Sequence, residues 1–144
     1  MPSSGSEAAL APLREALDRF APRGVVSAYV FGSTTAGRSH RESDIDVGVL
    51  FDRRVHPSPR ARFDAQLDLR RDLSPAVVGR DLDVVVLNDA SPLLGRRIVQ
   101  DGVRVYVANA EADHAFRRDV QLRAADLDPF IRRMRRLTLD ALAR

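Results

Sequence analysis

The run from Gly32 to Asp46, GSTTAGRSHRESDID, holds the residues most able to do chemistry. Gly32 and Ser33 follow the apolar run VVSAYVF, and ten residues later Asp44 and Asp46 open a second apolar run, IDVGVLF. Glycine lets the backbone approach a phosphate closely, and carboxylates bind the divalent cations that neutralise phosphate charge. The run therefore predicts a phosphoryl-transfer or nucleotidyl-transfer site.

Three carboxylates are the expected metal ligands. Asp44 and Asp46 are two positions apart at the start of an expected strand, so both side chains point to the same face. Like charges this close are unfavourable unless a cation lies between them, and Mg²⁺ prefers oxygen ligands. Asp83, in the strand-like run DLDVVVL, is the third candidate; Asp81 follows Arg80 and fits a surface ion pair. Each acid alone is explained as well by a solvent-exposed strand end, but together they favour a site for two ions.

The sequence around these residues predicts an α/β (α+β) fold, a short mixed sheet flanked by helices. Residues 1–144 are expected to form one domain, with a core over about 24–107 and C-terminal helices over about 111–144. Four runs rich in β-branched and aromatic residues predict strands, at residues 25–31, 45–51, 81–87 and 103–107.

Helical periodicity predicts the covering elements. A first helix is expected to end near residue 20, a short one to start near Ser33, and another to run from Ser91-Pro92 to about residue 100. A helix is also expected over 61–73, and its apolar side is assigned to Phe63, Leu67 and Leu69.

The last part of the chain is expected to be helical from residue 111. Asp128-Pro129 is typical of an N-cap and a first-turn proline, which predicts a kink or a new helix there. Beyond it lies an apolar stripe, which we expect to dock either on the domain or on a partner while the arginines face outward. The stripe consists of Leu127, Phe130, Ile131, Met134, Leu137 and Ala141, and the arginines are Arg132, Arg133, Arg135 and Arg136.

Composition excludes several classes of protein. The chain has no cysteine, so disulfides and thiolate metal sites are absent, and three scattered histidines do not suggest a zinc site. It has no signal peptide or membrane-spanning run, so a cytosolic, soluble protein is expected. The pI of about 10.4 reflects the absence of lysine rather than a large charge, since the net charge is only +3. Direct nucleic-acid binding is therefore not favoured.

Taken together, Gly32-Ser33, Asp44-Ile45-Asp46 and Asp83 resemble the pattern of the DNA polymerase β nucleotidyltransferase superfamily. Within it the chain is most similar to the minimal nucleotidyltransferases, the MNT proteins, over roughly residues 24–107. The resemblance implies that Asp44 and Asp46 bind both magnesium ions and that Asp83 binds the ion that activates the acceptor hydroxyl. It also implies that Gly32 and Ser33 hold the nucleotide phosphates.

Two loop residues complete the expected nucleotide site. Members of the family often carry an arginine immediately before the second glycine, where this chain has Ala36, and Arg38 is the residue that would replace its phosphate contact. Ser43 directly precedes Asp44 and is expected to orient that carboxylate.

The resemblance also implies a substrate and a partner. MNT proteins are commonly the antitoxin of a pair with a HEPN ribonuclease toxin, and transfer AMP from ATP to a tyrosine of that toxin. Two other functions remain open: a small-molecule nucleotidyltransferase of the aminoglycoside-modifying kind, and a non-catalytic module that neutralises a partner by contact.

Overall fold

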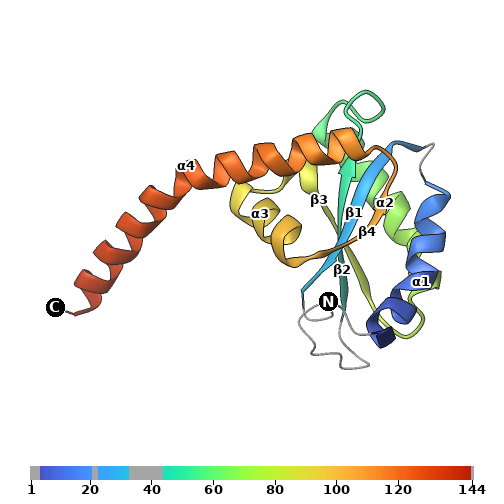
Figure 1. Ribbon diagram of the computed structural model, residues 1–144, viewed down its shortest axis with the longest axis horizontal. Coiled ribbons are helices and arrows are strands. Elements are labelled where there is room, and N and C mark those ends of the chain that lie inside the picture. Colours follow the sequence, from blue (N-terminus) through green and yellow to red (C-terminus); the bar gives the residue numbers. More distant parts are fainter. Residues whose placement is uncertain (1–3, 21–22, 33–43, 144) are drawn as a thin grey trace.

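The computed structural model describes residues 4–20, 23–32 and 44–143 (Figure 1). Its four strands form one mixed sheet in the order β3-β2-β1-β4. The central strand β1 is antiparallel to β2 and β4, while β2 is parallel to β3. The strands are β1 (Val25–Phe31), β2 (Ile45–Phe51), β3 (Leu82–Val86) and β4 (Val103–Val107). The expected mixed sheet flanked by helices is confirmed.

Helices cover both faces of this sheet. α1 (Ser4–Asp18) and α2 (Pro59–Leu73) pack on one face, and α3 (Pro92–Asp101) and α4 (Ala110–Leu142) pack on the other. Two short 3₁₀ turns, η2 (Ser74–Ala76) and η3 (Leu87–Asp89), lie on either side of β3.

α3 begins as its sequence predicts. The hydroxyl of Ser91 accepts a hydrogen bond from the backbone N–H of Leu94, and Pro92 occupies the first helical position. Among the helices that the structure describes, none has a stretch apolar enough to cross a bilayer.

α4 is one continuous helix, so the prediction of a second helix with Asp128 as its N-cap is wrong. The carboxylate of Asp128 instead accepts two hydrogen bonds, at 2.9 and 3.0 Å, from the guanidinium of Arg96 on α3. Pro129 lies inside the helix, where it removes one backbone hydrogen bond without ending the helix. Figure 1 shows α4 bending along its length, as a proline in a helix interior explains.

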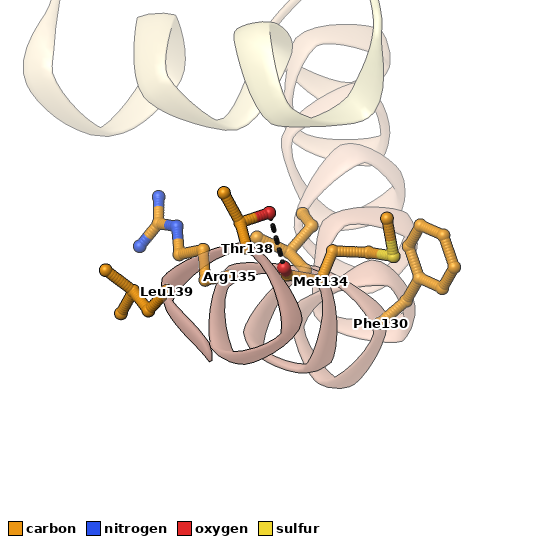
Figure 2. A pocket seen from close by; sticks show the side chains of 6 residues that line it. Phe130, Met134, Arg135, Thr138 and Leu139 are labelled. Carbon is orange, nitrogen blue, oxygen red and sulfur yellow. Dashed lines mark hydrogen bonds between the residues drawn. The ribbon is translucent and has the colours of Figure 1, made fainter. Parts of the chain in front are cut away.

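All the buried residues of α4 lie in its first half, and beyond them Asp128 makes its pair with Arg96. The buried residues are Asp113, Val120 and Ala124, whereas Phe130 and Met134 further along are 62% and 47% exposed. Docking of the apolar stripe on the domain, one of the two alternatives, is therefore wrong. Figure 2 shows these side chains projecting from the helix surface.

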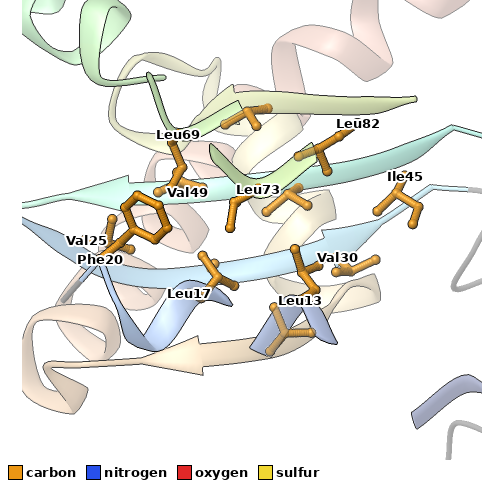
Figure 3. Packing of buried hydrophobic residues seen from close by; sticks show 14 of the residues in the cluster. Leu13, Leu17, Phe20, Val25, Val30, Ile45, Val49, Leu69, Leu73 and Leu82 are labelled. Atoms are coloured by element: carbon orange, nitrogen blue, oxygen red, sulfur yellow. The ribbon is translucent and has the colours of Figure 1, made fainter. Parts of the chain in front are cut away.

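The core between α1, α2 and the sheet is the larger of two hydrophobic clusters (Figure 3). Leu13 and Leu17 of α1 meet Leu69 and Leu73 of α2 above the alternate strand residues that face them. Burial of this apolar surface supplies the main force that holds the two helices on the sheet.

α2 faces the core with a different side from the one predicted. Phe63 and Leu67 are 51% and 46% exposed, so assigning them to the buried face was wrong, while Leu69 is buried as expected. The helix starts at Pro59, capped by Ser58, and the positions it buries are Arg62, Leu69 and Leu73. Phe63 lies about 100° around the helix from Arg62, which places it on the solvent side.

Arg62 is a buried charge that ties α2 to the segment after β3. It is 2% exposed, and its guanidinium donates hydrogen bonds of 2.9 and 2.8 Å to the two carboxylate oxygens of Asp89. A third bond, of 3.0 Å, goes to the carbonyl oxygen of His56. The hydrogen-bonded Arg62 guanidinium holds the pKa of Asp89 below its usual range.

Asp89→Ala is expected to destabilise the protein by about 2–4 kcal/mol at pH 7, because it leaves Arg62 buried without its counter-charge. Since the folded-state pKa of Asp89 is lowered, its contribution is present above about pH 4, its unfolded pKa, and is lost as the pH falls through the folded pKa. Urea unfolding at pH 7 and at pH 3 measures both effects. The control is Asp64→Ala, whose ion pair with Arg60 on the same helix is exposed. Equal losses of unfolding free energy in the two variants would contradict this role of the Arg62–Asp89 pair.

Candidate active site

The ends of β1 and β2 bring the first part of the candidate site together. Phe31 pairs with Asp46, so Gly32, which follows β1, and Asp44, which precedes β2, lie at the same edge of the sheet. Ser33, Arg38 and Ser43 were assigned to the nucleotide site from the sequence; they lie outside the described residues.

Asp46 and Asp83 are register partners across the parallel pair β2 and β3. Their neighbours Val47 and Val84 are also partners, are almost fully buried, and belong to the core beneath α1 and α2. Because side chains alternate along a strand, both carboxylates point to the opposite face, the one that carries α3 and α4. The structure therefore brings two of the three predicted acids side by side, and the pairing of Phe31 with Asp46 brings Asp44 to the same edge.

The three carboxylates influence one another electrostatically. Partial burial raises the pKa of Asp46, and the negative charges of Asp83 and Asp44 raise it further. Asp44 and Asp83 are exposed, while Asp46 is half-buried. Three acids whose charges repel at one solvent-open edge form an arrangement that a divalent cation would stabilise.

Gly32 packs directly against this carboxylate cluster. Its φ is +86°, and a Cβ atom at this position would lie 2.6 Å from Oδ2 of Asp46. A side chain would therefore meet both backbone strain and a collision with the acid. The glycine keeps the backbone close to Asp46, which fits a site where backbone and carboxylate approach one ligand together.

Within the part of the chain that the structure describes, no group of three or more acidic or histidine side chains is already arranged to hold a metal ion. Joint ligation by Asp44, Asp46 and Asp83 would therefore require side-chain rotations. Three carboxylates offer only oxygen ligands, and the water-exposed edge leaves room for water and phosphate in the remaining positions, so the donor chemistry fits Mg²⁺.

Gly48 allows α3 to lie close behind the acids. A Cβ atom there would come within 3.0 Å of Leu87 and 3.2 Å of Ile98, the second of which is on α3. Gly48 is two positions after Asp46, so both residues face the same layer. α3 therefore packs on the same face of the sheet as the candidate acids, close to Asp46.

A buried polar network on this face was missed from the sequence. Asp113 of α4 is fully buried and accepts hydrogen bonds from the hydroxyls of Ser27 and Tyr29, at 2.6 and 2.5 Å. Arg104 adds a 3.0 Å ion pair, and Arg117 donates to the Tyr29 hydroxyl at 3.2 Å. Burial and the bond to Asp113 raise the pKa of Tyr29. Ser27 and Tyr29, two positions apart in an otherwise apolar strand, share one face, and this was the sequence signal for a buried polar network.

The family comparison matches the region that builds this edge of the sheet. Residues 15–111 match the model described as polymerase beta, nucleotidyltransferase. The chain belongs to this family. It is therefore a nucleotidyltransferase, and its match spans every strand of the sheet and all three candidate acids.

Solved structures share the nucleotidyltransferase fold over most of their length. A chain of a structure described as the toxin-antitoxin with AMP-PNP is 25% identical, with a TM-score of 0.59, over 92% of this chain and 97% of that one. A chain of the toxin-antitoxin MntA-HepT is 19% identical, with a TM-score of 0.59, over 96% and 99% of the two chains.

A third similar chain belongs to tri-AMPylated Shewanella oneidensis HEPN toxin in complex with MNT antitoxin. It is 21% identical, with a TM-score of 0.56, over 96% of this nucleotidyltransferase and 99% of that chain. At these lower identities the second and third structures establish the fold alone. A search of curated protein sequences gave no significant match.

Proposed function

We propose that this protein is a Mg²⁺-dependent nucleotidyltransferase that transfers AMP from ATP to a protein hydroxyl. We further propose that the acceptor is a tyrosine of a HEPN toxin, so that the protein acts as the antitoxin of the pair in the cytoplasm. The observation that carries the catalytic part is the placement of Asp46 beside Asp83, with Asp44 and Gly32 at the same edge of the sheet.

Each residue of the edge has a proposed role. Asp44 and Asp46 would hold two magnesium ions, and Asp83 would hold one of them. Gly32 and Ser33 would hold the nucleotide phosphates, Arg38 would contact a phosphate oxygen, and Ser43 would orient Asp44. Magnesium, when bound, supplies neutralisation of phosphate charge and a lower pKa for the acceptor hydroxyl.

The reaction is an in-line displacement at the α-phosphorus. The acceptor oxygen forms a bond to this phosphorus, the bond to the bridging oxygen breaks, and pyrophosphate leaves with that oxygen. The hydroxyl proton passes to solvent. The chain's own contribution is to hold three carboxylates at one edge of a rigid sheet, so catalysis comes from positioning and charge stabilisation.

The support for a protein acceptor comes from the relatives. The 25% identical chain was solved as part of a toxin-antitoxin with AMP-PNP, an ATP analogue, and the match extends over nearly the whole of both chains. The Shewanella oneidensis complex contains a HEPN toxin that carries AMP groups. Transfer of AMP to a protein is consistent with the bound nucleotide analogue in the first complex and with the AMP groups on the toxin in the second.

Transfer from labelled ATP tests the proposal. The neighbouring gene is first read for a HEPN toxin, and the protein is then incubated with Mg²⁺ and that candidate HEPN protein, using ATP labelled at either the α- or the γ-phosphate. Only the α-label should appear on the HEPN protein, and mass spectrometry should place it on a tyrosine. Label on an aminoglycoside instead would favour a small-molecule enzyme. Neutralisation of the toxin with no label on it would favour a non-catalytic module.

Mg²⁺ together with a non-hydrolysable ATP analogue is expected to raise the melting temperature. At about a hundred times the dissociation constant the gain is about 2.7 kcal/mol, or about 5–10 °C for a chain of this size. Asp83→Asn should remove most of this shift because the ligand set loses a carboxylate. Asp81→Asn is the matched control, since it removes an exposed acid two positions away, one residue before the strand. Equal shifts in both variants would exclude Asp83 as a ligand.

A further inference from the structure

The second half of α4 exposes a row of large apolar side chains. Phe130 is 62% exposed, Met134 47% and Leu137 55%. Their spacing of four and three residues places them along one side of the helix. A contiguous apolar surface of this kind on a folded chain marks an interaction site.

This part of α4 has little to stabilise it as an isolated helix. The last buried residue of the helix is Ala124, and the helix continues to Leu142. Unpacked helices of this length are marginal in water. The ion pair between Arg96 and Asp128 fixes the direction in which this part leaves α3. A binding partner would supply the missing packing.

A basic cleft of about 550 Å³ lies between α3 and this part of α4. Four arginines line it against only two aspartates, and one aspartate, Asp128, is already paired with Arg96. Among the ion pairs of the described residues, none involves Arg97, Arg132 or Arg135. The cleft thus has two more arginines than aspartates, and three of those arginines are in none of these ion pairs.

The cleft and the apolar row meet at Ile131 and Arg135, which line both the cleft and the hollow shown in Figure 2. They also lie on the acid-bearing face of the sheet, because Asp46 and Gly48 point to the layer that contains Ile98 of α3. In Figure 1 the second half of α4 runs out past α3 and away from the sheet. A body seated here would cover the α3 side of the domain, which is the side to which the candidate acids point.

We propose that the α3–α4 surface binds an acidic surface, with apolar side chains at its centre, on the protein that accepts the nucleotidyl group. The α3–α4 surface is defined by Arg97, Phe130, Arg132, Met134 and Arg135. The identity of the partner rests on the proposed function. The place of binding rests on the arginines of the cleft and on the exposed apolar side chains of α4.

The charge of the surface favours an acidic partner over a second copy of the chain. Two copies packed through this helix would bring their arginines together, and like charges oppose association. The apolar row, from Phe130 to Leu137, spans only about one heptad, which is shorter than a stable coiled coil needs. An acidic protein satisfies the arginines and covers the apolar row at once.

Two sets of variants test the surface, each with a matched control. Arg97, Arg132 and Arg135 changed together to Gln are expected to weaken binding of the HEPN protein at least tenfold and to reduce its salt dependence. The control changes the exposed Arg60, Arg70 and Arg118 to Gln, for the same change in net charge.

Phe130→Gln is expected to weaken binding of the HEPN protein at least fivefold. Leu122→Gln is its control, because Leu122 is on the same helix and, like Phe130, is 62% exposed. Titration calorimetry measures affinity for the HEPN protein, and circular dichroism confirms that each variant is folded.

The catalytic assay separates this inference from the proposed function. Asp46→Asn should bind the HEPN protein as the wild type does while failing to label it. If the variants of the α3–α4 surface weaken HEPN binding but the wild-type protein puts no label on the HEPN protein, the proposed reaction is overturned and the α3–α4 surface is supported. Unchanged affinity in the arginine and Phe130 variants would overturn the surface, whatever the label shows. The surface is also overturned if the variants abolish self-association or RNA binding while HEPN binding stays unchanged.

Discussion

Asp46→Asn is expected to lower the rate of nucleotidyl transfer by about a thousandfold or more. Asp46 lies between the other two acids, since it is the register partner of Asp83 and is two positions from Asp44. An amide at this position is a neutral and weaker ligand for Mg²⁺. The loss should appear in the transfer of α-label under saturating Mg²⁺ and ATP.

The same variant is expected to fold at least as stably as the wild type in the absence of metal. Burial and the charges of Asp83 and Asp44 raise the folded-state pKa of Asp46, so its charged form is disfavoured in the native state. Replacing it by a neutral side chain of the same shape removes this penalty at neutral pH. Thermal melts in EDTA check this, with Asp81→Asn as the control. Transfer retained in Asp46→Asn would remove Asp46 from the proposed ligand set, and a lower melting temperature than the wild type in EDTA would contradict the expected relief of charge repulsion.

Asp113→Ala is expected to be the most destabilising single change considered, at about 3–5 kcal/mol. The fully buried carboxylate accepts hydrogen bonds from Ser27, Tyr29 and Arg104. Its removal leaves two buried hydroxyls and a partly buried guanidinium without their acceptor. For a chain of this size the melting temperature should fall by about 10–15 °C.

Asp119→Ala on the same helix is the control, because Asp119 is exposed and makes only a surface pair with Arg123. It should change stability by less than about 1 kcal/mol. Asp113→Asn keeps the shape and should retain part of the stability. A small effect of Asp113→Ala would show that α4 is held by Val120 and Ala124 alone, and not by the polar network.

The strands were predictable because their residues carry a local signal. β1, β2 and β4 have the predicted bounds, since each is a run rich in β-branched and aromatic residues that begins directly after a glycine or an aspartate. Asp44 and Asp46 could be placed on one face from the alternation of side chains within their strand, and Asp83 was expected on a neighbouring strand. That β3 lies beside β2 and parallel to it depends on the whole topology, which no local pattern shows.

The errors fell where tertiary contacts override local pattern. Arg62 occupies a core-facing position of α2 because Asp89, distant in sequence, neutralises it, and this turned Phe63 outward. Asp128 looked like an N-cap, but a partner on α3 takes its carboxylate. Asp113 gave no periodic signal that set it apart from the exposed acids around it. Each of these depends on a residue that only the folded chain brings near.

The strand pairing also bears on how readily each part of the site forms during folding. Asp44 and Asp46 reach Gly32 when β1 and β2 pair, which joins segments that are close in sequence. Asp83 arrives only when β3 adds to β2 in parallel, after α2 has crossed between them. Non-local parallel pairing is the slower of the two events, because more chain must be ordered before the contact forms. A chain in which only β1 and β2 had paired would hold Asp44 and Asp46 at this edge without Asp83, so the proposed ligand set is complete only once β3 has joined the sheet.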